Sequence, residues 1–216
     1  MKAALRALAL ASMLASAGCA RPAPPRAKPA LALLTSLPIL FPERFGLGRP
    51  AGAAVAERLE RDFRLMPIAA SDTASLDGQR LLLMIQPRAQ TAENLVALDD
   101  WMRGGGRAML LADPRLDWPS DKPLGDLTRP PMAFPDTGLL LHWGVRLDDS
   151  GTSAGRLVAT GPGCAVEAEG ARARCRIGRG EAVIVADADA IDPRRQGSAA
   201  ATDALVTLLK ALATPR

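Results

Sequence analysis

Residues 81–114, LLLMIQPRAQTAENLVALDDWMRGGGRAMLLADP, constrain the fold more than any other part of this chain. An apolar run, a stretch with helical spacing, three glycines and a second apolar run predict a strand, a helix and a strand. Neither apolar run alternates with polar residues, so both strands should be covered on both faces, as in a parallel sheet between helices. This pattern predicts a fold class and no reaction, because such sheets carry many different activities.

Similar patterns predict further elements on both sides of this unit. We expect a mostly parallel α/β sheet of about five or six strands, with helices on both faces and an antiparallel β-hairpin extension within a β insertion at 145–177. Thr91 is expected to cap the helix that ends at Arg103, Gly104 to stop it in a left-handed conformation, and Ser198 to cap the last helix. The expected strands are 30–34, 64–69, 80–86, 108–112, 145–147, 156–160 and 181–186, and the expected helices are 53–63, 91–103, 138–143 and the segment after 198.

The segment CAVEAEGARARC, residues 164–175, alternates small or apolar residues with charged ones and predicts a β-hairpin. A two-residue turn at Glu169-Gly170 would place Glu167 opposite Arg172 and Cys164 opposite Cys175. Residues opposed in a hydrogen-bonded pair lie about 5.5 Å apart between Cα atoms, which is within disulfide reach. We therefore expect a structural disulfide in an oxidising compartment. A redox-active pair is the alternative, but the CxxC spacing is absent.

The first 18 residues have the pattern of a signal peptide. Lys2 and Arg6 precede an apolar stretch, and small residues follow it near an expected cleavage site. The apolar stretch is shorter than the about 20 residues that a membrane-spanning helix needs. We therefore expect export to the periplasm.

Cys19 follows Ala17-Gly18, and small residues before a cysteine resemble the bacterial lipoprotein box. That box implies lipidation of Cys19, and several acyl chains anchor a protein stably. Ordinary cleavage after Ala17, which would leave Cys19 as an unmodified thiol, remains the alternative. Residues 19–29 are rich in proline and predict an extended tether, so a single α/β domain is expected over 30–213.

The charge and aromatic content argue against nucleic-acid binding. Removal of Lys2 and Arg6 lowers the basic count from 27 to 25 against 23 acidic residues, so the net charge falls from +4 to +2. The chain has no tyrosine, three tryptophans and four phenylalanines. Nucleic-acid binding requires a basic face with stacking aromatic side chains, and the sequence shows neither.

The sequence also lacks the usual signs of a catalytic nucleophile. No G-x-C-x-G elbow occurs, and a Ser/His/Asp triad would have to use His142, the single histidine, for which a helix-end role is expected. The Gly104-Gly105-Gly106 run follows a helix and precedes a strand, which is the reverse of a phosphate-binding loop. We expect no cofactor.

Aspartates are the remaining polar candidates. Asp113, Asp187 and Asp189 follow central strands, and ligands bind at the carboxyl ends of strands in open α/β sheets. Asp117 and Asp121 lie on a proline-rich segment, residues 113–137, which shows no periodicity and is expected to be functional or disordered. The aspartates are expected either to cap turns and helices or to bind a partner, a polar ligand or a divalent cation, although no metal-ligand spacing is present.

The segments QPRAQTAENLVALDDWMRGGGRAMLLADP, LLLHWGVRLDD and GRGEAVIVADADAID resemble the extracytoplasmic domain of gliding-motility-type ABC transporter auxiliary proteins. The resemblance implies a non-catalytic version of the class I glutamine amidotransferase-like, flavodoxin-like fold. It further implies an accessory role beside a transporter.

Two functions follow as hypotheses. The first is a non-enzymatic, membrane-tethered periplasmic interaction domain, accessory to an ABC-type transport or cell-envelope assembly. It would bind an envelope membrane protein or transporter complex through the carboxyl ends of its strands and residues 113–137. The second is a periplasmic metal-assisted hydrolase that uses Asp113, Asp187 and Asp189.

Overall fold

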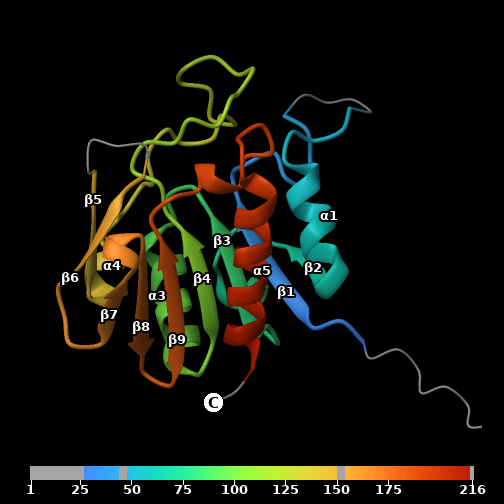
Figure 1. Ribbon diagram of the computed structural model, residues 1–216. Coiled ribbons are helices and arrows are strands. Elements are labelled where there is room, and N and C mark those ends of the chain that lie inside the picture. The colour runs from blue at the N-terminus through green and yellow to red at the C-terminus, as the bar shows by residue number, and fades with distance from the viewer. Residues whose placement is uncertain (1–26, 44–47, 150–153, 215–216) are drawn as a thin grey trace, which may run out of the picture.

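The computed structural model describes residues 27–43, 48–149 and 154–214 (Figure 1). The expected signal peptide, Cys19 and tether residues 19–26 lie outside these ranges, and residues 27–29 enter the domain without regular secondary structure. In the described ranges, no helix combines the length and apolar character needed to cross a membrane.

A seven-stranded sheet in the order β2-β1-β3-β4-β9-β8-β7 forms the centre of the domain (Figure 1). The first five strands are parallel and follow the strand order of flavodoxin-like sheets, and β8 and β7 extend the sheet as an antiparallel hairpin. The predicted α/β class is confirmed. The strands are β1 (Ala30–Thr35), β2 (Arg64–Pro67), β3 (Leu81–Ile85), β4 (Arg107–Leu111), β7 (Cys164–Glu167), β8 (Arg172–Ile177) and β9 (Gly180–Val185).

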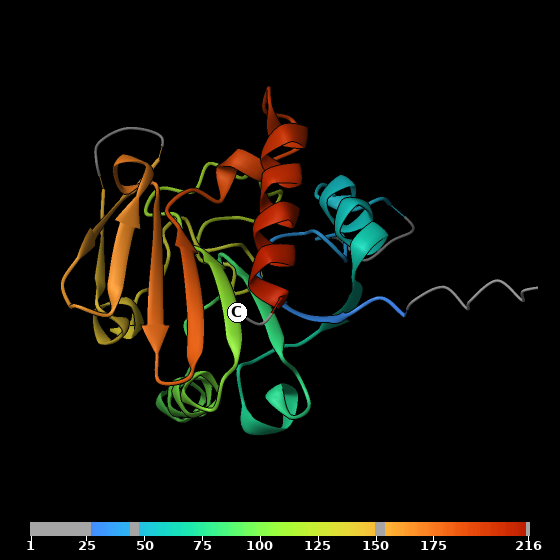
Figure 2. The same ribbon diagram turned by 60° about the horizontal axis from the view of Figure 1, so that its bottom comes forward.

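Helices cover both faces of the sheet, as predicted (Figures 1 and 2). The helices α1 (Ala53–Asp62) and α5 (Ser198–Ala213) pack on one face. The other face carries α2 (Thr73–Leu76), α3 (Ala92–Arg103) and α4 (Leu139–Trp143). Two short 3-10 helices, η1 (Ala168–Gly170) and η2 (Asp189–Ile191), complete the set.

The burial of β3 explains why its sequence does not alternate. All five of its residues are buried, and successive side chains belong to different apolar clusters. Leu83 packs with Leu59 of α1 and Leu209 of α5, whereas Leu82 packs on the opposite face with Leu98 of α3. Both faces of the strand therefore need apolar side chains.

The predicted insertion at 145–177 divides between two sheets. β5 (Val145–Asp148) and β6 (Arg156–Ala159) form a separate antiparallel pair. Val145 and Leu157 are buried in the same apolar cluster as Ala173 and Cys175 of β8. The small sheet therefore covers this face of the hairpin extension together with α4, whose Leu140 and Trp143 belong to the same cluster.

The predicted hairpin register is confirmed, and its turn is longer than predicted. Cys164 pairs with Cys175 and Glu167 with Arg172, and the two cysteines form a disulfide. Their Cα atoms are 4.1 Å apart, so they match the closer, non-hydrogen-bonded kind of pair. The expected two-residue turn is wrong, because pairing ends at Glu167 and the chain passes through η1 before β8 begins.

Helix ends match the sequence analysis in part. The Thr91 side chain accepts a hydrogen bond from the Asn94 backbone N–H at 3.3 Å and caps α3, as predicted. Ser198 is the first residue of α5, and Gly197 precedes it at a φ of 84° without a side-chain cap, so the expected Ser198 cap is wrong. Gly104 is right-handed and Gly105, with a φ of 108°, makes the left-handed turn instead.

Candidate binding edge at the carboxyl ends of the strands

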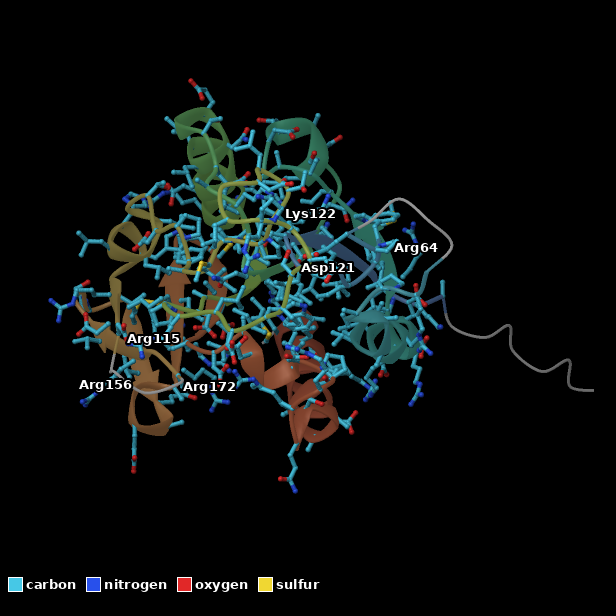
Figure 3. The ribbon with its side chains drawn as sticks, turned by 90° about the horizontal axis from the view of Figure 1, so that it is seen from above. Arg64, Arg115, Asp121, Lys122, Arg156 and Arg172 are labelled. Carbon is cyan, nitrogen blue, oxygen red and sulfur yellow. A yellow bond between two sulfur atoms is a disulfide. The ribbon has the colours of Figure 1, made fainter. Side chains whose placement is uncertain are left out.

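The aspartates predicted after the central strands meet at one edge of the sheet. The β4 and β9 strands are parallel neighbours with Leu111 opposite Val185, so the residues that follow them leave the sheet side by side. Asp113 and Asp189 are buried, with exposed fractions of 0% and 1%. We call this side of the molecule the carboxyl-end edge; Figure 3 looks onto it from above.

The Asp113 carboxylate joins the ends of β4 and β9. Its Oδ1 accepts a hydrogen bond from the Arg115 backbone N–H at 2.8 Å. Its Oδ2 accepts two more, from the N–H groups of Ala188 at 3.0 Å and Asp189 at 3.3 Å. Both oxygens are therefore used by the backbone, as in a residue that fixes loops in place.

Asp189 is held less completely than Asp113. Its Oδ2 accepts a hydrogen bond from the Asp117 backbone N–H at 2.8 Å and pairs with Arg195 at 3.0 Å. Its Oδ1 is buried and has no hydrogen-bond partner among the described residues. Burial raises the pKa of Asp189 from 3.8 to about 6, the nearby Asp113 adds to this effect, and the hydrogen bond from Asp117 opposes it.

Asp187 lies beside this pair and turns toward the following 3-10 helix. Its Oδ1 accepts a hydrogen bond from the Ala190 backbone N–H at 2.8 Å. Burial raises the pKa of the Asp187 carboxyl, again with a contribution from Asp113. A raised pKa favours the neutral acid, which is a poorer cation ligand than a carboxylate.

The two aspartates on segment 113–137 have different surroundings. Asp117 is brought to the cluster, since its N–H contacts Asp189, but its side chain is 87% exposed and pairs with Arg195 at 3.2 Å. The Asp121 backbone N–H instead donates to Glu43 Oε2 at 2.9 Å. Asp121 and Lys122 lie above the middle of the edge in Figure 3. In the described ranges, no group of three or more His, Cys, Asp or Glu side chains is placed to hold a metal ion.

The buried Gln86 was missed by the sequence analysis. It follows β3 directly and adopts a φ of 41°, a left-handed conformation that is uncommon for residues other than glycine. Its side-chain Oε1 accepts from the Asp113 N–H at 2.9 Å, while Nε2 donates to the carbonyls of Asp113 at 3.1 Å and Pro131 at 3.3 Å. Gln86 thus fastens both limbs of segment 113–137 to the sheet. The sequence does contain a signal for this role, because Gln86 is a single polar residue between the apolar run LLLMI and Pro87.

Segment 113–137 has fixed ends and an exposed tip. Leu116 and Trp118 are buried in the core cluster beside α5, and Phe134 packs against the cluster on the other face. The expectation that the whole segment forms a binding surface is therefore too broad. Residues 119–132, which we call the loop tip, lie at the carboxyl-end edge (Figure 1). Leu124 (75%), Leu127 (88%) and Met132 (57%) are exposed to solvent in this segment.

A pocket of about 470 Å³ opens beside the loop tip, at the carboxyl ends of β1 and β2. Thr35 and Pro67 contribute from the strand ends, Thr128 comes from the loop tip, and Phe41 reaches the pocket while 70% exposed. The lining is mainly apolar. An apolar patch with polar surroundings at a strand-end edge is a common form of ligand or protein binding site.

His142 occupies the predicted helix-end position. It lies in the last turn of α4, and its Nε2 is 3.1 Å from Asp99 Oδ1 of α3. Among the described residues, no hydrogen bond joins the His142 side chain to Asp113, Asp187 or Asp189. The Gly104–Gly106 run joins α3 to β4, and a Cβ at Gly106 would lie 2.4 Å from the Trp101 ring. Close packing therefore explains Gly106.

Comparison with known proteins shows the fold. No protein-family model matches the chain, and no curated protein sequence matches it. The solved structure of the mmIFT52 N-terminal domain is similar with a TM-score of 0.54 and 10% identity, over 86% of this chain and 100% of that one. The exo-β-1,4-mannosidase Op5Man5 from Opitutaceae bacterium strain TAV5 has a TM-score of 0.50 and 12% identity over 89% of this chain. This chain spans 37% of that enzyme's length. Both likenesses concern the fold alone.

Proposed function

We propose that this protein is a non-enzymatic partner-binding domain, exported and tethered to a membrane through Cys19. It acts as an accessory component of an ABC-type transport or cell-envelope assembly. The observation that carries the proposal is the exposure of Leu124 and Leu127 on the loop tip, beside the apolar pocket that contains Phe41. Apolar side chains held out from a fixed loop favour contact with a protein partner.

The state of the edge aspartates supports binding rather than catalysis. Both oxygens of Asp113 accept backbone hydrogen bonds, and Asp189 Oδ2 holds Asp117 and Arg195. A nucleophile or general base needs a free lone pair directed toward a substrate. In the hydrolase hypothesis, Asp113 and Asp189 Oδ2 would have to leave their present partners. Asp189 Oδ1 has no partner among the described residues, but it is buried and a substrate could not reach it without a rearrangement of the edge. We therefore favour the interaction domain.

Two observations support the cellular setting. The Cys164–Cys175 disulfide suits an oxidising compartment such as the periplasm. The resemblance to auxiliary proteins of ABC transporters is the reason for proposing an ABC-type transport assembly as the partner. The similarity to the mmIFT52 N-terminal domain adds support for the fold and none for the partner.

Site-specific photo-crosslinking in living cells tests the binding edge. A photoreactive amino acid at position 127 should form an adduct with an envelope or transporter protein. The same probe at position 96 is the matched control, because Val96 is 61% exposed and belongs to α3 rather than to the loop tip. Leu124→Asp should abolish the adduct at position 127. Equal adducts at both positions, or none at 127, would contradict the proposed binding edge.

Radiolabelled palmitate tests the anchor separately. The wild-type chain should incorporate the label, and Cys19→Ala should not. A Cys164→Ala/Cys175→Ala variant keeps Cys19 and should incorporate the label like the wild type. Absence of label from the wild type would remove the lipid anchor from the proposal.

A further inference from the structure

The edge of the sheet opposite the loop tip has a basic residue at the start of every parallel strand. Because parallel strands begin at a common edge, these residues gather on one side, which we call the amino-end edge; Figure 2 brings it forward. Arg176, at the end of the antiparallel β8, joins them. The strand-start residues are Lys28, Arg64, Arg80, Arg107 and Arg179.

Their charges are not neutralised by the protein. Within the described ranges, none of these six residues forms an ion pair with a carboxylate, whereas Arg172, higher on the same hairpin, pairs with Glu167 at 2.6 Å. The contacts of the strand-start residues are to neutral groups. Arg107 donates to the Leu212 carbonyl at 2.7 Å, and Arg179 donates to the Gly104 carbonyl at 3.3 Å. Lys28 donates to the Glu60 carbonyl, and Arg64 lies 2.9 Å from the Met66 sulfur.

The basic residues outnumber the unpaired acidic ones nearby. Glu60, Asp77 and Asp100 are exposed near the ends of α1, α2 and α3, which approach the same edge. The edge therefore has six basic groups and three unpaired carboxylates. The amino-end edge therefore carries excess positive charge, although the whole sequence has a net charge of only +4.

Part of this edge forms a pocket of about 630 Å³. The β-sheet register places Arg107, Glu181 and Arg176 in one row across β4, β9 and β8. Arg174 and Arg179 also line the pocket, and Glu181 is already paired with Arg174. Four arginines thus surround one glutamate. A planar guanidinium group with several N–H donors suits a phosphate group.

The tether enters the domain at this same edge, through Lys28 and the residue after it. In an extended, proline-rich conformation, residues 19–29 would reach about 34 Å. A domain anchored at Cys19 would therefore stay close to the membrane surface. Short tethers give effective concentrations of about millimolar, so a weak surface contact is sufficient to orient the domain.

We propose that the amino-end edge docks on an anionic phospholipid surface through the phosphate groups of the lipids. The unpaired arginines at the strand starts and in the pocket make the contact. This orientation directs the loop tip away from the membrane, toward a partner. The inference rests on the proposed anchor for its cellular setting, but the surface binding is measurable without lipidation.

The experiment uses the full chain with Cys19→Ser and an intact Cys164–Cys175 disulfide. Co-sedimentation compares vesicles of phosphatidylcholine alone with vesicles that also contain phosphatidylglycerol. The test variant carries Arg80→Gln, Arg176→Gln and Arg179→Gln. The matched control carries Arg49→Gln, Arg88→Gln and Arg115→Gln, which remove the same charge from the side of the domain that carries the loop tip.

The Cys19→Ser chain should bind the anionic vesicles, and binding should weaken as salt rises. Each arginine near an anionic surface contributes about fivefold, so the test variant should lose about a hundredfold in partitioning. The control variant should stay within about threefold of the Cys19→Ser chain, because its arginines face away from the surface. Circular dichroism checks that both variants fold.

Two results would overturn the docking proposal: no binding to anionic vesicles, or equal losses in the two variants. Neither of them bears on palmitate labelling or on crosslinks from the loop tip, so failure here is distinguishable from failure of the proposed function.

Discussion

Asp113 Oδ2 lies 3.0 Å from the Ala188 backbone nitrogen, and this contact joins the ends of two neighbouring strands. Both groups are buried. The same carboxylate also accepts from the Asp189 and Arg115 N–H groups, so one side chain satisfies three backbone donors. Loss of this carboxylate would leave those donors without their acceptor, at least one of them fully buried.

Asp113→Ala should lower the free energy of unfolding by about 3 kcal/mol, because each buried donor left unpaired costs about 1–3 kcal/mol. Asp113→Asn keeps one acceptor oxygen and should lose roughly half as much. Urea denaturation followed by circular dichroism measures both changes. An alanine variant as stable as the wild type would show that Asp113 is not a structural residue.

Asp189 should make stability depend on pH. Its pKa is raised from 3.8 to about 6, so folding favours the neutral acid. The stabilising contribution of Asp189 to the free energy of unfolding is fully present below pH 3.8 and is lost as the pH rises through about 6. Its size is about 3 kcal/mol, because this is the free energy that corresponds to two pKa units. Urea unfolding of the wild type and Asp189→Asn from pH 4 to pH 7 measures it. The stability of the variant relative to the wild type should rise up to about pH 6 and then level off.

If the free energies of unfolding of Asp189→Asn and the wild type differed by a constant amount across that pH range, this would contradict the raised pKa of Asp189. Asp62 provides the control. Lys210 and Arg58 lower its pKa, so its contribution is present above its unfolded pKa and is lost as the pH falls. Asp62→Asn should therefore reduce stability at neutral pH and have a smaller effect in acid.

The sequence predicts the sheet and its edge because these depend on local patterns. Unbroken apolar runs identify the strands covered on both faces, and parallel pairing then places Asp113 and Asp189 together. Alternation in residues 164–175 predicts the hairpin register for the same reason. The prediction of a two-residue turn was wrong because Ala168 and Glu169 adopt positive φ values, which are not expected for alanine or glutamate.

The detailed contacts of the edge depend on distant segments and could not be predicted. Gln86 meets Asp113 and Pro131 only after β3, β4 and segment 113–137 are assembled. Similarly, the Asp189 carboxylate accepts from Asp117, which is 72 residues away in the chain. The spacing of residues in the sequence does not show which backbone N–H group will donate a hydrogen bond to a buried carboxylate.

The Cys164–Cys175 disulfide should stabilise the hairpin extension. The two residues are 11 positions apart, and closing a loop of this size contributes up to about 3 kcal/mol. Cys164→Ala/Cys175→Ala should lower the melting temperature, and a reducing agent should lower it for the wild type alone. Mass spectrometry of alkylated, unreduced protein provides the check on pairing, and alkylation of both cysteines would contradict the disulfide.

Gln86 should control the order of segment 113–137. Gln86→Ala removes the side-chain contacts to Asp113 and Pro131 but leaves a Cβ at a φ of 41°. Gln86→Gly removes the same contacts and relieves the backbone strain, so it should be more stable than Gln86→Ala by about 1 kcal/mol. In both variants, amide hydrogen exchange should rise across residues 113–137, whereas β1 should stay protected. Unchanged exchange in this segment would mean that the buried Leu116 and Trp118, rather than Gln86, hold the loop in place.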